Sequence, residues 1–437
     1  MNSVLVISYY WPPSGGPGSQ RVVKFVRYLP EFGWNPIVLT VQKGEFPYLD
    51  PSLGNDLPES LPVFRARSAD PFALYKKFTG KSRQENIPVG LLMQQPRSFK
   101  ERLATAVRSN LFVPDARIGW IPFACRIARQ LIRQYSIRLI FVSSPPHSSQ
   151  LIATRLKREF GLPYVADLRD PWTDIRYYQY VHRSTFTRWL DARLERKVLE
   201  TADALTTVSQ DLVRLFSGKT SLNIRNKFYI LPNGYDEADF TGLTYQPGEH
   251  FTILHTGNMQ DHQNPELLWQ VLSEMIRETP ALREKIRVQL IGRTHPSVEE
   301  SVNRYQLKEM VAFLPFQPHN EIVRRMKQAD LLLMVIPRVE NNLGIVTGKF
   351  FEYLGSNRPV LVIGPPESDA GRMLRPLHGS LIVDYTDRQR LKAYLTRALA
   401  LREAGEWEFD NGEYVRQFSR RALTQKLAEI FRQLLER

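Results

Sequence analysis

Short apolar runs alternate along the chain with amphipathic segments in which apolar residues recur at helical spacing. Short apolar runs bounded by Gly or Pro predict buried strands, and a 3.6-residue period predicts helices. The expected strands are residues 3–9, 36–41, 139–142, 164–167, 204–209, 251–257, 287–291, 331–335 and 360–363. Strands that alternate with helices form parallel sheets. The pattern therefore predicts an α/β protein built from doubly wound parallel sheets.

The strand-and-helix pattern starts a second time at residue 251, after a stretch that contains Pro247 and Gly248. A chain of 437 residues is long enough for two domains of about 200 residues, each with its own core. We therefore expect one domain over residues 1–240 and another over 250–412, with 245–250 as the linker. Residues 414–435 are amphipathic and basic, which predicts a final helix.

The segment 344–359, GIVTGKFFEYLGSNRP, is followed by the apolar strand VLVIG. A Gly-rich turn here leads into a helix, and Glu352 lies near the start of that helix. A carboxylate at this place can accept hydrogen bonds from two ribose hydroxyls, while Lys349 and backbone N–H groups can face phosphate. The alternative is that Glu352 only complements the helix dipole.

Glycines and a histidine follow two predicted strands of the first half. The loop SYYWPPSGGPGSQR contains Gly15 and Gly16, which allow the backbone to approach an anion closely. The segment SSPPHSSQ places His147 at the carboxyl end of strand 139–142, where open α/β sheets bind ligands. His147 is therefore a candidate partner for a sugar hydroxyl, although a lone His is more often structural.

The segment PYVADLRDPWTD ends strand 164–167 in a charged loop. Its ionisable residues include Asp167, Arg169 and Asp170. From the residues alone, they predict a salt-bridged corner covered by Trp172.

Together these segments resemble the retaining glycosyltransferases of family four, of the type that builds bacterial surface polysaccharides. TGKFFEYLGSNRPVL is similar to the donor-nucleotide segment of that family. The Y-x-P-P-x-G-G-x-G loop, PPHSS, D-x-R-D-P-W and ILPNGYDEADF match further family segments, so the resemblance covers nearly the whole chain. It implies the GT-B fold, in which two Rossmann-like domains face a central cleft. The last helix, here within 413–437, returns to the N-terminal domain in that fold.

The resemblance also implies a role for individual residues. In the family, the matching Glu holds the ribose, the matching His contacts the donor sugar, and D-x-R-D-P-W lies at the cleft. The implied catalytic residues are His147, Lys349 and Arg293. The implied nucleotide-sugar-binding residues are Gly15, Gly16, Gly257, Lys349, Phe350 and Glu352. The implied acceptor-side residues are Asp167, Arg169 and Asp170.

Three positions depart from the family pattern. Gly344 stands where the first Glu of the Glu-x7-Glu motif is expected. Asn258 and Gln263 stand where the family has an Arg and a Lys that grip the pyrophosphate. We expect Arg293 or Lys349 to supply the missing charge.

The chemistry implied by the resemblance is transfer of a sugar from a nucleotide-sugar to a saccharide or lipid-linked acceptor, with retention of configuration. In the front-face attack that this family uses, the leaving diphosphate takes the proton of the acceptor. The protein then contributes charge stabilisation and orientation. No cofactor is expected beyond the nucleotide-sugar co-substrate. The sequence contains no Asp-x-Asp motif, and no metal is expected.

The net charge of +14 is distributed unevenly. Residues 1–230 contain 33 Lys/Arg and 18 Asp/Glu, a balance of +15, and the remainder contains 26 and 27. Residues 76–138 alone hold 13 basic and 3 acidic residues. Such a cluster attracts nucleic acid, acidic lipid or phosphate-bearing acceptors. Residues 91–114 alternate apolar and cationic residues, which predicts either a helix lying on a membrane or a solvated surface helix.

Features of cellular location are few. The single cysteine, Cys125, excludes an intramolecular disulfide and fits a reducing compartment. The first apolar run is too short for a signal peptide, and no run approaches the roughly 20 residues of a membrane span. We therefore expect a cytoplasmic protein, either free or bound peripherally at the inner face of the membrane.

Three alternatives remain open at this point. An inactive protein that only binds nucleotide-sugars would fit the departures from the family pattern. A nucleotide-sugar epimerase of the same fold would share the nucleotide site but would not need an acceptor. A nucleic-acid-binding protein would use the basic half, but no recognised binding motif accompanies that charge, so no nucleic-acid partner is expected.

Overall fold

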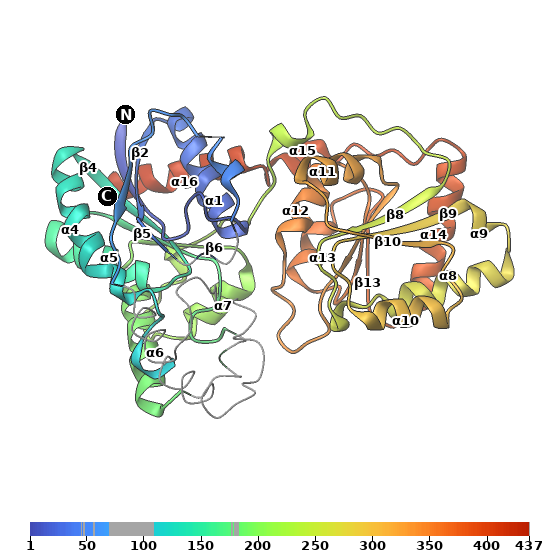
Figure 1. Cartoon of the computed structure of the whole chain (residues 1–437), viewed down its shortest axis with the longest axis horizontal. Coiled ribbons are helices and arrows are strands. Elements are labelled where there is room, and N and C mark those ends of the chain that lie inside the picture. Colours follow the sequence, from blue (N-terminus) through green and yellow to red (C-terminus); the bar gives the residue numbers. More distant parts are fainter. Residues whose placement is uncertain are drawn as a thin grey trace. The chain divides into compact units, whose positions relative to one another are not determined.

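The computed structural model of the protein describes residues 1–44, 46, 49–55, 57–69, 109–175, 178 and 183–436. Most of the predicted basic helix at 91–114, and the part of the cationic cluster before residue 109, lie outside the described residues. The chain divides into two compact units (Figure 1). The first unit comprises Met1–Pro232 and Leu423–Arg437, and the second comprises Asn233–Ala422.

The first unit contains a seven-stranded parallel sheet with the order β3-β2-β1-β4-β5-β6-β7. Its strands are β1 (Asn2–Ile7), β2 (Trp34–Val41), β3 (Val63–Ala66), β4 (Ile137–Ser144), β5 (Tyr164–Leu168), β6 (Ala204–Thr207) and β7 (Phe228–Ile230). Its helices are α1 (Pro17–Tyr28), α4 (Ile121–Gln134), α5 (Ser148–Phe160), α6 (Thr185–Thr201), α7 (Gln210–Ser217) and most of α16 (Arg420–Leu435).

Both faces of this sheet are buried. On β1, Leu5 and Ile7 enter a core shared with α4 and α5, while Val4 and Val6 enter a core shared with α1 and α16. Strands that are covered on both faces have continuous apolar sequences, because alternate side chains point to opposite cores. This burial explains why apolar runs identified the central strands.

The second unit contains a six-stranded parallel sheet with the order β10-β9-β8-β11-β12-β13. Its strands are β8 (Phe251–Thr256), β9 (Ile286–Ile291), β10 (Val311–Leu314), β11 (Leu331–Val335), β12 (Val360–Ile363) and β13 (Leu381–Val383). Its helices are α8 (Glu266–Glu278), α9 (Leu282–Lys285), α10 (Pro296–Arg304), α11 (His319–Gln328), α12 (Gly348–Gly355), α13 (Asp369–Leu374), α14 (Arg388–Glu403) and α15 (Gly412–Arg416). The two parallel-sheet α/β units confirm the predicted fold class.

The strand order reverses between β1 and β4 in the first sheet, and between β8 and β11 in the second. Open parallel sheets bind ligands beyond the carboxyl ends of the strands at such reversals. The loops that follow β1, β4 and β8 carry Gly15 and Gly16, His147, and Gly257, respectively. Each sheet therefore gathers predicted site residues at its own reversal point.

The predicted single helix over 414–435 is wrong, because two helices, α15 and α16, occupy this region. Residues between them pair with a distant segment: Tyr235 N–H donates to Phe418 O (3.2 Å), and Arg420 N–H donates to Tyr235 O (2.7 Å). The hydroxyl of Ser419 then accepts from Ala422 N–H (3.1 Å) at the start of α16. Backbone pairing with Tyr235 therefore interrupts the helical period.

The second of these helices, α16, contributes Leu423, Leu427 and Phe431 to a core of the first unit. Phe431 packs edge-to-face against Trp34 of β2, with 5.1 Å between ring centroids. None of the helices in the described ranges is long and apolar enough to cross a membrane.

Candidate active site

A buried ion pair lies beneath the carboxyl edge of the first sheet. The guanidinium of Arg21, on α1, donates to both carboxylate oxygens of Asp167, on β5, at 2.8 and 3.1 Å. The same carboxylate accepts from the hydroxyls of Ser143 (2.7 Å) and Thr206 (2.8 Å). Burial opposes the ionisation of Asp167, but Arg21 and these donors hold its pKa below the ordinary value. Asp167 therefore contacts protein groups on every side.

Arg169 and Asp170 follow at the same edge and are only partly exposed. A Cβ atom on Gly18 would lie 2.5 Å from Arg169 Nη1, so the guanidinium occupies space that only a glycine leaves open. Burial lowers the pKa of Arg169 and raises that of Asp170, each opposed by the other's charge. Neither side chain makes a hydrogen bond to the residues that the structure describes. This guanidinium, at the N-terminal end of α1, is available to an anion.

His147 immediately precedes α5 and is 4% exposed. Its imidazole stacks on Trp172, with 4.5 Å between ring centroids and 12° between ring planes. Neither ring nitrogen has a hydrogen-bond partner among the described residues. Burial, assisted by the charges of Arg169 and Lys219, lowers the pKa of His147 to about 3. The imidazole is therefore neutral at physiological pH, with one donor and one acceptor unused.

The glycine-containing loop after β1 packs its backbone closely against the segment around Asp50. A Cβ on Gly15 would lie 2.8 Å from Asp50 Cβ. Gly16 is the N-cap of α1 and has φ of 90°, which favours glycine. The first turn of α1 contains no acidic residue, so its N–H groups keep their positive potential.

In the second unit, two glycines and a lysine meet at the ends of β8 and β9. Gly257 has φ of +88°, and a Cβ placed there would be 3.4 Å from Lys349 Nζ. A Cβ on Gly292 would be 2.7 Å from Gly257 O, so the two backbones pack directly. Lys349 Nζ also lies 3.3 Å from Nε2 of His255, whose Nδ1 lies 2.9 Å from Leu333 O. The ammonium group is thus held over a bare stretch of backbone.

The charge state of this lysine is set by its surroundings. Burial lowers the pKa of Lys349 to about 8, with a small opposing effect from Glu352. Burial and the charge of Lys349 lower the pKa of His255 to about 3. A largely protonated lysine therefore stands beside a neutral imidazole at pH 7.

Glu352 lies on the first turns of α12, as predicted. Its carboxylate makes no hydrogen bond or ion pair with any residue in the described ranges. Burial raises its pKa, while the charges of His319, Arg420 and Lys349 partly oppose this rise. Both carboxylate oxygens remain available to hydroxyl donors of a ligand.

Three other residues named in the sequence analysis, Phe350, Gln263 and Arg293, differ in burial and in side-chain contacts. The side chain of Phe350 is buried in a core and packs edge-to-face on Phe351, so a ligand cannot reach it. The side chain of Gln263 is part of a capping box with Gln260 and also donates to Val335 O (3.4 Å). Gln263 thus has a local structural role where the family has a cation. Arg293 is exposed, and its side chain has no ion pair with the described residues.

The sequence did not lead us to two residues, His255 and Tyr353, that shape the site around Gly257. His255 is the one ionisable residue in strand β8, two positions before Gly257, and that placement was a usable signal. The hydroxyl of Tyr353, on α12, accepts from Thr256 N–H (2.8 Å) at the end of β8. Tyr353 therefore secures the strand end that carries Gly257.

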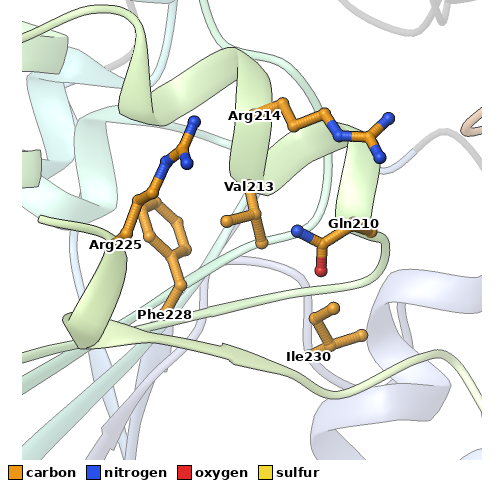
Figure 2. Close-up of a pocket in the computed structure, with 6 residues that line it drawn as sticks. All are labelled: Gln210, Val213, Arg214, Arg225, Phe228 and Ile230. Carbon is orange, nitrogen blue, oxygen red and sulfur yellow. The ribbon is translucent and has the colours of Figure 1, made fainter.

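A separate cavity of about 310 Å³ lies beside the edge strand β7 of the first unit (Figure 2). In Figure 2, Arg214 and Arg225 flank the apolar side chains of Val213 and Phe228. The lining residues are Gln210, Val213, Arg214, Arg225, Phe228 and Ile230. None of them is a predicted site residue. Within the described ranges, no three His, Cys, Asp or Glu side chains gather as a metal site would require.

Comparison with known proteins gives one family and a consistent fold. Residues 16–234, just over half of the chain, match a family model described as a glycosyl transferase 4-like domain. A D-inositol 3-phosphate glycosyltransferase from Kineococcus radiotolerans is 24% identical over 172 residues, which span 35% of this chain and 38% of that protein.

Solved structures are similar over the full length. Sucrose-phosphate synthase from Thermosynechococcus elongatus has a TM-score of 0.63 and 15% identity, with 100% of each chain covered. The Anabaena protein HepE, in complex with UDP-glucose, has a TM-score of 0.57 and 14% identity, with 99% of each chain covered. These likenesses show that the chains share one fold.

Proposed function

The chain belongs to the glycosyl transferase 4-like family, and we propose that it transfers the sugar of a nucleotide-sugar donor with retention of configuration. It is a glycosyltransferase with the GT-B fold. The proposed acceptor is a saccharide or a lipid-linked saccharide in surface polysaccharide biosynthesis. The observation that carries the proposal is the pair of available charges, Lys349 and Glu352, at the reversal point of the second sheet.

The second unit offers the chemistry that a nucleoside diphosphate needs. The carboxylate of Glu352 accepts hydrogen bonds from the two ribose hydroxyls. The ammonium of Lys349 faces the diphosphate next to Gly257, where no side chain covers the backbone. The Anabaena protein that shares this fold was solved with UDP-glucose, which supports a nucleotide-sugar as donor. The side chain of Gln263 is held in a capping box and is not available to phosphate. Lys349 therefore supplies the positive charge that the family places at positions 258 and 263.

The proposed mechanism relies on orientation and charge rather than on a protein nucleophile. As the glycosidic bond to the diphosphate breaks, negative charge grows on the leaving oxygen, and protonated Lys349 stabilises it. The acceptor hydroxyl attacks from the same face and gives its proton to the departing diphosphate. The neutral imidazole of His147 either accepts a hydrogen bond from a sugar hydroxyl or donates one to it.

The test is a donor screen followed by product analysis. Each of UDP-glucose, UDP-galactose, GDP-mannose and a dTDP-sugar is added, and the shift in Tm identifies the donor, because a ligand bound only by the native state raises stability. Hydrolysis or transfer of that donor is then followed by proton NMR. A product with the anomeric configuration of the donor supports the proposal. An inverted product, or stabilisation by no nucleotide-sugar, contradicts it.

We propose further that the acceptor is presented at an anionic membrane surface. The charge balance of +15 lies in residues 1–230. The exposed face of α6 adds two aromatic residues, Phe186 (68% exposed) and Trp189 (53% exposed), whose rings stack at 5.9 Å. By helical spacing the cations on the same face are Arg193, Arg196 and Lys197, while Asp191 and Glu195 are buried on the opposite side. Aromatic and cationic side chains on one helix face favour the membrane interface.

Liposome flotation tests this second proposal. The wild type should float with anionic vesicles at low salt and detach as salt rises. Each Lys or Arg near an anionic leaflet adds about 1 kcal/mol, so replacing Lys76, Lys77, Lys81, Arg97, Lys100 and Arg102 with Gln should abolish flotation and leave donor hydrolysis intact. Trp189→Gln should weaken flotation, whereas Phe316→Gln, at an exposed phenylalanine of the second unit, should not. A wild type that ignores anionic vesicles at low salt favours a soluble acceptor.

A further inference from the structure

We propose that Trp172 is a positioning residue that fixes the imidazole of His147 in the orientation in which it meets the donor sugar. The two rings are nearly parallel, with centroids 4.5 Å apart, and Trp172 is fully buried. The inference rests on the proposed function, because it assigns to His147 a hydrogen bond to the sugar.

Stacking has to set the ring orientation because hydrogen bonding does not. Neither nitrogen of His147 has a partner among the described residues. The backbone next to it is fixed, since Ser148 N–H and Ser148 Oγ donate to the two carboxylate oxygens of Asp115, each at 2.8 Å. The histidine thus has an anchored main chain, while Trp172 is the group stacked on its ring.

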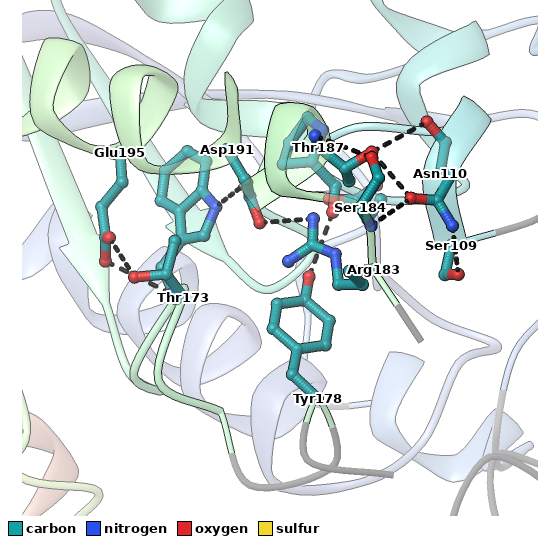
Figure 3. A network of polar contacts seen from close by, with 12 residues as sticks. Ser109, Asn110, Thr173, Tyr178, Arg183, Ser184, Thr187, Asp191 and Glu195 are labelled. Carbon is teal, nitrogen blue, oxygen red and sulfur yellow. Dashed lines mark hydrogen bonds and ion pairs between the residues drawn. The ribbon is translucent and has the colours of Figure 1, made fainter. Parts of the chain in front are cut away.

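Trp172 is itself anchored by polar contacts that lead to Asp191 and Arg183, two residues labelled in Figure 3. Its indole Nε1 donates to Asp191 Oδ1 on α6 at 2.7 Å. The other oxygen of Asp191 forms an ion pair with Arg183 Nη2 at 2.8 Å, and both of these side chains are buried. The Arg183 guanidinium lies 4.1 Å from the ring centroid of Tyr178. These contacts prevent the indole from rotating.

A second carboxylate of α6 holds the adjacent residue. Glu195, one helical turn after Asp191, accepts from Thr173 Oγ1 at 2.6 Å and pairs with Lys219 Nζ at 2.8 Å (Figure 3 shows the Thr173 contact). Carboxylates at i and i+4 share one helix face. That face of α6 therefore fastens consecutive residues of the loop, and the loop carries the stacking surface for His147.

A double-mutant cycle separates positioning from ordinary core packing. We expect Trp172→Leu to lower kcat for donor turnover about 100-fold, the scale of loss expected when a reacting group is misplaced. Nucleoside diphosphate affinity should change less than about twofold, since Trp172 is not among the residues proposed to bind the diphosphate or the ribose. In a His147→Ala background, Trp172→Leu should lower kcat by less than about twofold further. Multiplication of the two single losses would overturn the inference.

The matched control is Trp269→Leu. Trp269 is also fully buried, and its indole donates to a side chain, Asn264 Oδ1, at 2.9 Å, but in the second unit. The Trp269→Leu variant should destabilise the fold about as much as Trp172→Leu does, and it should leave the kcat effect of His147→Ala unchanged. Where Trp172→Leu does not fold, Trp172→Phe keeps an aromatic surface and removes the indole donor. That variant should lose kcat by a smaller factor, again only when His147 is present.

Histidine-selective NMR decides the inference independently of turnover. The signal that disappears in His147→Ala belongs to this imidazole. Removing the stacked indole should admit water and move the pKa of His147 from about 3 toward the ordinary value, although Arg169 and Lys219 still face it. Trp269→Leu should not move it. An unshifted signal in Trp172→Leu overturns the inference, whereas a wild type without donor turnover but with the expected shift overturns only the proposed function.

Discussion

The two sheets each hold an acidic and a basic residue near the reversal of strand order, and they treat the two residues in opposite ways. In the first unit, Arg21 and Asp167 are fully buried, in bidentate contact, and saturated with further hydrogen bonds. In the second unit, Lys349 and Glu352 are only partly buried and form no ion pair within the described part of the chain. The first arrangement neutralises its charges internally, and the second keeps them available.

The difference separates stability from binding. A satisfied buried pair needs both partners, because either charge left alone would be strongly unfavourable. Ionisable groups that are desolvated but unpaired are typical of functional sites, where a ligand completes their contacts. The Arg21 pair also accounts for a long-range contact: Arg21 Nη1 donates to Pro232 O at 2.7 Å, at the last residue of this unit before the chain enters the second. Substitutions in the two pairs should therefore have different consequences.

The largest effect is expected from breaking the buried pair. Asp167→Ala leaves the guanidinium of Arg21 uncompensated, and should lower the free energy of unfolding by about 3–5 kcal/mol, as measured by urea denaturation. Because the pKa of Asp167 is lowered in the folded protein, its stabilisation is present at neutral pH and is lost as pH falls below the ordinary carboxyl range.

The control for this prediction is Arg129→Ala. Arg129 and Glu159 form a pair at 2.9 Å that is 42% and 39% exposed, so its loss should change stability by about 0–1 kcal/mol. Equal effects of the two substitutions would contradict the structural role assigned to the buried pair.

The next effect concerns the available cation. Lys349→Ala should lower kcat about 10²–10³-fold, as expected when a group that stabilises developing charge is removed. Binding of the nucleoside alone should change much less. Because the pKa of Lys349 is lowered to about 8, the wild-type rate should fall as pH rises through about 8, where the ammonium loses its proton. Lys349→Arg stays charged there and should retain its rate. A full rate in Lys349→Ala would place the compensating charge elsewhere.

A smaller effect is expected from the available carboxylate. Glu352→Gln should weaken nucleotide binding by about 1–3 kcal/mol, because hydrogen bonds to a charged acceptor are replaced by weaker ones. Calorimetric titration with UDP and GDP measures the change. Glu340→Gln is the control, since Glu340 is an exposed carboxylate in the loop before α12. Equal affinities of wild type and Glu352→Gln would exclude Glu352 from the site.

The fold was largely predictable because its central strands are buried on both faces and its helices are amphipathic. The break between α15 and α16 was not, because it depends on pairing with Tyr235, far earlier in the chain. A short edge element such as β13, of three residues, carries too little pattern to be recognised.

The site was predictable only where function depends on local sequence. Glu352 and Lys349 follow a Gly-rich turn, so their position on α12 could be predicted from spacing. The contact between His255 and Lys349 spans 94 positions, and that between Trp172 and Asp191 spans 19. Such contacts depend on tertiary packing, which a single sequence does not specify. The identification of Gln263 as a capping residue likewise required the structure.

The smallest predicted effect concerns two glycines with positive φ, one in each unit. Gly257→Ala and Gly33→Ala both place a Cβ on a residue with positive φ, +88° and +83°, and each should lower stability by about 1–2 kcal/mol. A Cβ on Gly33 meets no atom within 4 Å, whereas one on Gly257 lies 3.4 Å from Lys349 Nζ. Only Gly257→Ala should also reduce donor turnover, because the methyl group covers the backbone on which the diphosphate is proposed to rest. Thermal denaturation and donor hydrolysis, measured on both variants, give the two readouts. Equal turnover in the two alanine variants would mean that the diphosphate does not approach Gly257, and that Lys349 acts from another side.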